Sequence, residues 1–261
     1  MIRIGGAIFV ALLVFALLVW WGPHDHAGQS YAPNLIASLL ELTIGGVLVA
    51  WVVRWDRRRR LAPTRDAALL LAGRSLMRII AVLADAYVEG TVDAPVDPPA
   101  TIGELLTGWQ NAVRHLDLTA EPRVSRGELW RDYMPRQFAL GIGELGEVTT
   151  RFTEALEHRF VNAVVQIEID SFANLLLDVP RVAAYFGPRP PRTLPTYLLT
   201  YERFSLSDRD LANLYALFEQ RLTELLNAYN AIATNPIHLD ERFFYRRYPY
   251  DRWGVSAILG Y

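Results

Sequence analysis

Two long apolar runs dominate the beginning of the chain. The first, Ile4 to Trp21, carries no charge and as a helix spans about 27 Å, and the second, Asn34 to Val53, spans about 30 Å. Both lengths match the hydrocarbon thickness of a bilayer. Trp20 and Trp21 suit a membrane interface, which favours a retained anchor over a cleaved signal peptide. We therefore expect a transmembrane helical hairpin at residues 1–60, with the loop from Gly22 to Pro33 outside the cell.

A basic cluster follows the second run and predicts the orientation of the hairpin. Lysine and arginine concentrate on the cytoplasmic side of membrane helices, where they also attract anionic lipid headgroups. The expected localisation is a bacterial inner membrane with both termini in the cytoplasm. The residues expected to contact the lipid bilayer are Arg57, Arg58, Arg59 and Arg60.

One acid, Glu41, interrupts the second apolar run. An ionised side chain near a bilayer centre costs about 3 kcal/mol, so Glu41 should face protein or water. Three interpretations stay open: a structural bridge to the first helix or a neighbouring copy, the lining of an aqueous path, or a proton-linked site. Most of them favour a homo-oligomer or a subunit of a membrane complex, because two helices scarcely bury a carboxylate. Small residues that permit close helix packing are Gly45, Gly46 and Ala50 on the second run and Ala7 and Ala11 on the first.

The pattern after residue 60 is helical throughout, which predicts an all-α fold with a cytosolic helical domain at residues 61–240. Pro63 should open the first of these helices. Capping boxes are expected at Thr101–Glu104, Ser125–Glu128 and Ser207–Asp210. The predicted helices cover residues 64–90, 101–116, 135–160, 162–179 and 207–233, with a proline-rich loop at 187–195.

Composition narrows the chemistry that the chain can perform. It contains neither cysteine nor lysine, which excludes thiol nucleophiles, Cys-ligated metals, P-loop lysines and Schiff bases. A lysine-free chain rich in Ala, Leu and Arg suggests a GC-rich bacterial genome. Residues 61–261 carry 20 arginines and 25 acids, a mildly acidic balance that argues against nucleic-acid binding. We find no catalytic set and expect a non-enzymatic protein without metal or cofactor.

Two short motifs have a chemical and a structural interpretation. The segment Gly141 to Gly146 reads G-x-G-x-x-G, and acids follow at Glu168 and Asp170, as in a dinucleotide-binding fold. The strand that this fold needs before Gly141 is barely present, so glycines that permit tight helix packing are the favoured interpretation. The sequence His24-Asp25-His26 is expected to be a solvated loop, because three residues on a flexible segment are poor evidence for a metal site.

The C-terminal tail, residues 241–261, is rich in arginine and aromatic side chains. These residue types are frequent at interfaces and stack through cation–π contacts. The tail is predicted either to bind a subunit, a partner or the membrane surface, or to pack on its own domain. The candidate interface residues are Phe243, Phe244, Tyr245, Arg246, Arg247 and Trp253.

The hairpin residues Asn34, Leu35, Glu41, Leu42 and Gly45 or Gly46 form the pattern NL…EL…G before a charged exit. This pattern resembles uncharacterised bacterial proteins in which a two-transmembrane-helix hairpin precedes a helical cytosolic domain. The resemblance covers about the first 60 residues and implies no activity.

These observations predict a membrane protein that self-assembles and forms or gates an ion- or proton-conducting path. The alternative is a membrane-anchored scaffold or accessory subunit whose helical domain and tail bind a partner. A third, remote hypothesis is nucleotide sensing at Gly141 to Gly146.

Overall fold

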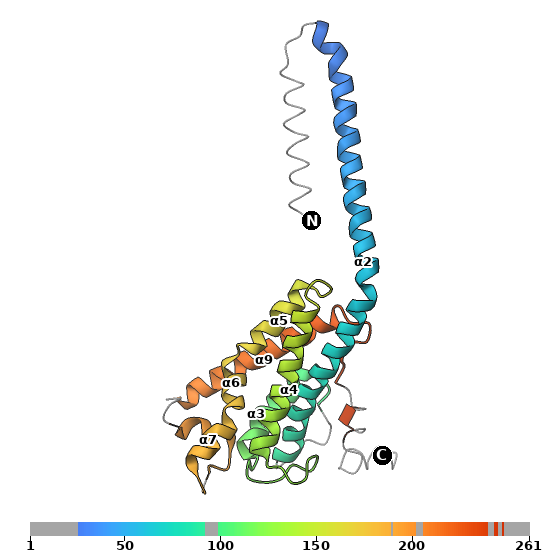
Figure 1. The fold of residues 1–261 in the computed structure, drawn as a ribbon. Coiled ribbons are helices and arrows are strands. Elements are labelled where there is room, and N and C mark those ends of the chain that lie inside the picture. The colour runs from blue at the N-terminus through green and yellow to red at the C-terminus, as the bar shows by residue number, and fades with distance from the viewer. Residues whose placement is uncertain are drawn as a thin grey trace. The chain divides into compact units, whose positions relative to one another are not determined.

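The computed structural model describes residues 26–91, 99–188, 190–201, 206–239, 243, 244 and 247. All regular structure in these residues is helical (Figure 1), which confirms the predicted all-α fold. The chain divides into two compact units, Met1–Ala62 and Pro63–Tyr261. The first predicted helix, with Ala7 and Ala11, lies outside the described residues, as do His24 and Asp25.

Helix α2, His26–Gly90, is longer than the sequence predicted. It begins within the expected outer loop and continues through Pro63, so the expected helix start at that proline is wrong. A proline inside a helix removes one backbone hydrogen bond. The residues before it, WDRRRRLA, include no glycine or turn-forming pair, so nothing else in the local sequence ends the helix.

Seven further helices of the described residues belong to the second unit. Helix α5 packs against α9 and α4, α4 also contacts α6 and α7, and α3 contacts α8 and α9. The part of α2 that follows Pro63 joins them, because Gly141 of α4 lies against Ile79 and Gly73 of α2 lies against Tyr229 of α9. The bounds are α3 Ile102–His115, α4 Trp130–Arg151, α5 His158–Glu168, α6 Ser171–Leu177, α7 Val179–Phe186, α8 Leu194–Thr200 and α9 Asp208–Asn230.

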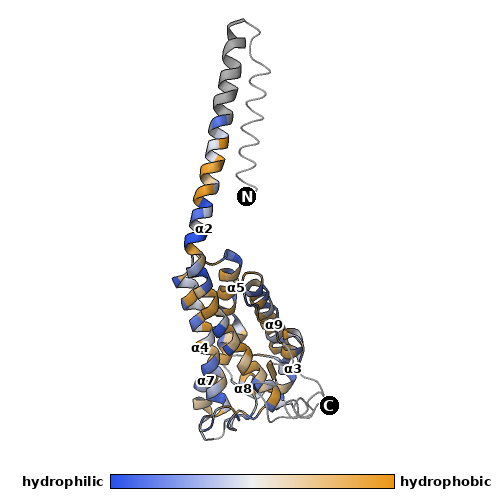
Figure 2. Cartoon of the chain, turned by 90° about the vertical axis from the view of Figure 1, so that its right-hand side faces the viewer, coloured by the Kyte–Doolittle hydropathy of each residue, from blue (hydrophilic) through white to orange (hydrophobic). Residues whose placement is uncertain are grey.

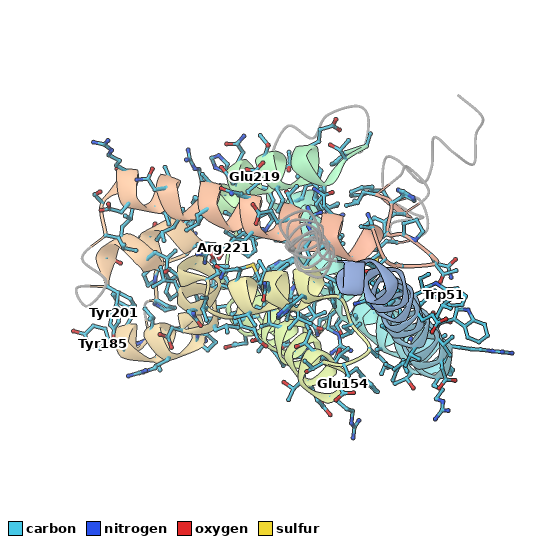
Figure 3. All side chains as sticks on the ribbon, turned by 90° about the horizontal axis from the view of Figure 1, so that it is seen from above. Trp51, Glu154, Tyr185, Tyr201, Glu219 and Arg221 are labelled. Carbon is cyan, nitrogen blue, oxygen red and sulfur yellow. The ribbon has the colours of Figure 1, made fainter. Side chains whose placement is uncertain are left out.

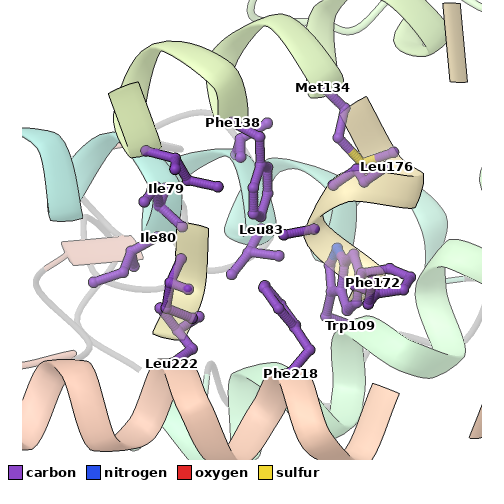
Figure 4. Close-up of a cluster of buried hydrophobic side chains, with 14 of the residues drawn as sticks. Ile79, Ile80, Leu83, Trp109, Met134, Phe138, Phe172, Leu176, Phe218 and Leu222 are labelled. Atoms are coloured by element: carbon purple, nitrogen blue, oxygen red, sulfur yellow. The ribbon is translucent and has the colours of Figure 1, made fainter. Parts of the chain in front are cut away.

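Large side chains of α2, α3, α4, α6 and α9 form the core of this unit (Figure 4). Each of them is at most 1% exposed. Burying one such side chain contributes about 1.5–3 kcal/mol, so each member of this cluster stabilises the unit. Its labelled members are Ile79, Ile80 and Leu83 of α2, Trp109 of α3, Met134 and Phe138 of α4, Phe172 and Leu176 of α6, and Phe218 and Leu222 of α9.

Two of the three predicted capping boxes start helices. The Thr101 hydroxyl accepts a hydrogen bond from the Glu104 backbone N–H, and Ser207 and Asp210 make the complete reciprocal pair. The expected box at Ser125 and Glu128 is wrong: both residues lie in a turn, and α4 starts later, after Leu129. Glu128 accepts a side-chain hydrogen bond from the Ser125 hydroxyl at 3.2 Å and two from Arg136, at 2.8 and 2.6 Å.

The two helices predicted for residues 135–160 and 162–179 are wrong in their boundaries. The chain leaves the helical conformation at residues 152–157 and bends by 51° between α5 and α6. Asp170 sets the bend, because its carboxylate accepts a hydrogen bond from the Ala173 backbone N–H at 3.0 Å and caps α6. Helix α8 begins inside the expected proline-rich loop, with Leu194 and Tyr197 fully buried.

Candidate functional site: the apolar part of helix α2

Glu41 is exposed on α2 and is followed by a stretch of exposed apolar side chains. From Ile44 to Val53, every large hydrophobic residue is at least 49% exposed, and Val49 and Trp51 exceed 60%. Figure 2 shows this stretch as a largely hydrophobic section of the helix, and Figure 3 shows Trp51 projecting away from it. A continuous apolar surface of this kind is rare on soluble monomers and marks an interaction site.

Two small residues lie on the side of α2 that is opposite Glu41. At 100° per residue, Gly46 and Ala50 are about 140° and 180° around the helix from Glu41, whereas Gly45 is about 40° away. A Cβ atom added to Gly45 or Gly46 would meet nothing within 4 Å. The helix therefore has a polar face at Glu41 and a smooth face at Gly46 and Ala50, and these three residues are exposed within the part of the chain that the structure describes.

The apolar stretch ends in aromatic and charged residues that contact each other. The Arg59 guanidinium carbon lies 5.4 Å from the Trp55 ring centroid, which is a cation–π distance. Arg60 forms an ion pair with Asp56 at 2.8 Å, one turn earlier. The side chains of Arg57 and Arg58 lie outside the described residues. An aromatic ring followed by guanidinium groups is typical of the boundary between hydrocarbon and headgroups.

Length and composition single out α2 among the described helices. Its segment from Thr43 to Gly90 is long and apolar enough to cross a membrane, and the bent pair of α5 and α6 passes the same test only when taken as one span. Core helices of soluble domains meet this test as well, and 56% of the apolar window in α2 is buried. The residues that distinguish α2 are therefore the exposed ones, from Ile44 to Trp55, and not its hydropathy.

The C-terminal tail packs on its own domain wherever it is described. Phe244 is fully buried in the core, and Phe243 packs against it. Arg247 donates two hydrogen bonds to the Asp85 carboxylate of α2, at 2.7 and 2.6 Å, and the Tyr133 hydroxyl donates a third at 3.0 Å. These side chains are therefore not free to form the expected partner surface. Tyr245, Arg246 and Trp253 lie outside the described residues.

Asp85 is the buried acid that the sequence analysis missed. It is fully buried and occupies the apolar segment IIAVLADAYV, which has the same pattern that drew attention to Glu41. Burial together with the charge of Asp85 raises the pKa of Tyr133 well above its usual value. The phenol therefore stays protonated and acts as a hydrogen-bond donor, and Arg247 supplies the compensating charge. We call Asp85, Tyr133 and Arg247 the tail clasp.

The glycine-rich motif lies inside α4 and has a packing role. A Cβ atom on Gly141 would approach Cγ1 of Ile79 to 2.6 Å, and one on Gly146 would collide with Glu168, whereas Gly143 faces open space. The strand–turn–helix context that a dinucleotide fingerprint needs is not formed there, because residues 130–151 are one helix. Gly141 therefore permits the close packing of α4 on α2, and the helical conformation of residues 130–151 is not the one that a dinucleotide fingerprint requires.

A cleft of about 380 Å³ lies beside the same crossing of α2 and α4. At this cleft, Ser75 donates a hydrogen bond to one oxygen of Glu144 at 2.9 Å, and Arg78 donates to the other at 2.8 Å. These contacts join the two helices. The Glu144 carboxylate that accepts the Ser75 hydrogen bond is also held by Arg78 in an ion pair, so the three side chains form one polar contact between α2 and α4. Among the described residues, no group of three His, Cys, Asp or Glu side chains could hold a metal ion.

Comparison with known proteins adds no assignment to this geometry. No protein family, no curated protein and no solved structure matches the chain.

Proposed function

We propose that the chain is a non-enzymatic integral protein of a bacterial inner membrane. It self-assembles through α2 and encloses Glu41 in a proton-responsive path. The observation that carries this proposal is the exposed acid at the beginning of an exposed apolar helix stretch, Glu41 followed by Ile44 to Val53. In water that surface would be unfavourable, and in lipid the apolar side chains are favourable while the acid requires a partner.

The energetics of insertion support this arrangement. The segment from Asn34 to Val53 contains eleven Leu, Ile and Val residues. Each contributes about 0.3–0.6 kcal/mol to membrane insertion, or about 3–7 kcal/mol together, which offsets the cost of about 3 kcal/mol for one ionised side chain. The helix is thus stable in the membrane with Glu41 present. If the Glu41 side chain faces lipid, however, its cost cancels much of the favourable free energy of insertion.

Self-assembly gives the carboxyl group a protected position. The smooth face at Gly46 and Ala50 permits close approach of a neighbouring helix, while the Glu41 face remains turned toward the other side. In an assembly of several copies, one face of α2 contacts a neighbour and the other encloses the acids. The enclosed carboxyl groups of neighbouring copies then line the path along which protons pass.

Reconstitution into liposomes tests the proposal. The purified full chain is expected to form oligomers in lipid, counted by stepwise photobleaching, and to pass protons, followed with an entrapped pH-sensitive dye. Glu41→Gln should reduce the flux to the level of empty liposomes. Asp56→Asn is the matched control, since it removes an acid from the same helix outside the apolar stretch, where it pairs with Arg60. A monomer in lipid, or an equal flux in Glu41→Gln, contradicts the proposal and favours a membrane-anchored scaffold.

A further inference from the structure

One side of α2 carries Glu41 and continues as far as the arginine cluster. Its large apolar side chains, those of Leu48, Val52 and Trp55, are each at least 50% exposed, so no described part of the chain covers them. We call this side the Glu41 face. At 100° per residue, the later positions up to residue 60 that lie within about 40° of Glu41 around the helix are Gly45, Leu48, Val52, Trp55 and Arg59.

The last two residues of the Glu41 face contact each other. The Arg59 guanidinium carbon lies 5.4 Å from the centroid of the Trp55 ring, so the ring holds the guanidinium group on this face. Asp56, the nearest acid in the sequence, pairs with Arg60 at 2.8 Å. The Glu41 face therefore ends in an aromatic ring and a positive charge that Asp56 does not compensate.

The position of Trp55 and Arg59 around the helix distinguishes them from an ordinary interfacial anchor. Aromatic and basic residues at a membrane boundary can lie on any side of a helix. Arg59 follows Glu41 by about five helical turns and lies on the same side, whereas Arg57 is about 160° away. In an assembly that encloses Glu41, Trp55 and Arg59 of neighbouring copies therefore come together at the cytoplasmic end of the enclosed space.

We propose that Trp55 and Arg59 form an inner gate, which slows protons and excludes larger cations from the path. This inference rests on the proposed function, because it requires that α2 assembles around Glu41. A ring of aromatic side chains narrows the path, and a ring of guanidinium groups repels sodium and potassium ions. Protons move along hydrogen-bonded water molecules and still pass this end slowly, whereas a hydrated cation does not.

Proton flux through liposomes that contain the full chain tests the gate. Trp55→Ala removes the ring that holds Arg59, so the flux should rise about two- to fivefold, the factor that corresponds to one cation–π contact between exposed groups. Trp55→Phe keeps an aromatic face and should raise the flux less. The double variant Glu41→Gln/Trp55→Ala should show the flux of empty liposomes, because the gate acts on the path that the acid lines.

Potassium flux, followed with an entrapped potassium-sensitive dye, tests the selectivity. The wild type should give the flux of empty liposomes, and Arg59→Gln should give a higher one. Arg57→Gln is the matched control, because it removes an arginine of the same cluster from the opposite side of α2, and it should not admit potassium. Circular dichroism and photobleaching counts compare insertion and assembly of each variant with those of the wild type. Arg59→Gln keeps the Trp55 ring and decides the question if Trp55→Ala does not assemble.

The outcomes separate the gate from the path itself. Proton flux that depends on Glu41, together with proton and potassium fluxes unchanged in Trp55→Ala and Arg59→Gln, refutes the gate and leaves the proposed function intact. Equal effects of Arg57→Gln and Arg59→Gln also refute the gate, because a general loss of positive charge at the membrane surface then explains both. If the wild type passes no protons, the proposed function and the gate are both wrong.

Discussion

Removal of Arg247 should destabilise the second unit far more than removal of an ordinary surface arginine. In Arg247→Gln, the fully buried Asp85 carboxylate loses two hydrogen bonds and its compensating charge and keeps the Tyr133 hydroxyl. Breaking one partner of a buried ion pair costs about 3–5 kcal/mol. We expect the lower end, about 3 kcal/mol, because the Arg247 side chain is itself 30% exposed.

Thermal unfolding of the full chain in detergent, followed by circular dichroism, measures this cost. For a unit of this size, 1 kcal/mol corresponds to about 2–4 °C, so the midpoint should fall by about 6–12 °C. Arg151→Gln is the matched control, since its ion pair with Glu147 is 3.8 Å long and more than two-thirds exposed, and it should change the midpoint by less than about 2 °C.

A double-mutant cycle identifies the cause. Asp85→Asn removes the charge that Arg247 compensates, so Arg247→Gln should cost less than about 1 kcal/mol when it is made in the Asp85→Asn background. If Arg247→Gln leaves the unfolding midpoint within 2 °C of the wild type, Arg247 does not bind Asp85 and the tail clasp is not formed. If the effects of the two substitutions simply add, the two groups do not form a pair.

Two further predictions concern α4 and the turn before it. Gly141→Val should destabilise the protein by about 1–3 kcal/mol, because the new side chain meets Ile79. Gly143→Ala, at a position that faces open space, should stabilise it by up to about 1 kcal/mol. If chemical denaturation shows that Gly141→Val is the more stable of the two variants, Gly141 has no packing role. Hydrogen bonds from Arg136 lower the pKa of Glu128. Their contribution to the free energy of unfolding is therefore present above the ordinary pKa of a glutamate and is lost as the pH falls through the lowered pKa. In Arg136→Ala, this pH-dependent contribution should be missing from denaturation curves measured between pH 7 and pH 3.

Local sequence signals predicted those parts of the fold that depend on local interactions. The caps at Thr101 and Ser207 were predictable because a side chain three residues from its partner closes the first turn wherever the rest of the chain goes. The same pattern failed at Ser125, where Glu128 is held by Arg136 in a turn. Helix breaks within continuous apolar periodicity were not predictable, because Asp170 owes its position partly to Arg221, which is 51 residues away and forms a 2.8 Å ion pair with it.

The candidate sites could likewise be predicted only where the signal lies in the neighbouring sequence. Glu41 is recognisable because one acid in an apolar run stands out in any sequence. Asp85 satisfies the same criterion, yet its partner Arg247 is 162 residues away and no local pattern connects them. Only the tertiary structure places these groups together.

The proposed function requires that the beginning of the chain crosses a membrane with the arginine cluster inside the cell. Because the chain contains no cysteine, single cysteines at Gly28 and Ala62 provide unique labelling positions near the two ends of the apolar part of α2. In intact cells, a membrane-impermeant maleimide should label Gly28→Cys, and it should label Ala62→Cys only after the membrane is permeabilised. Labelling of Ala62→Cys in intact cells, or recovery of the protein in the soluble fraction without detergent, would contradict the account.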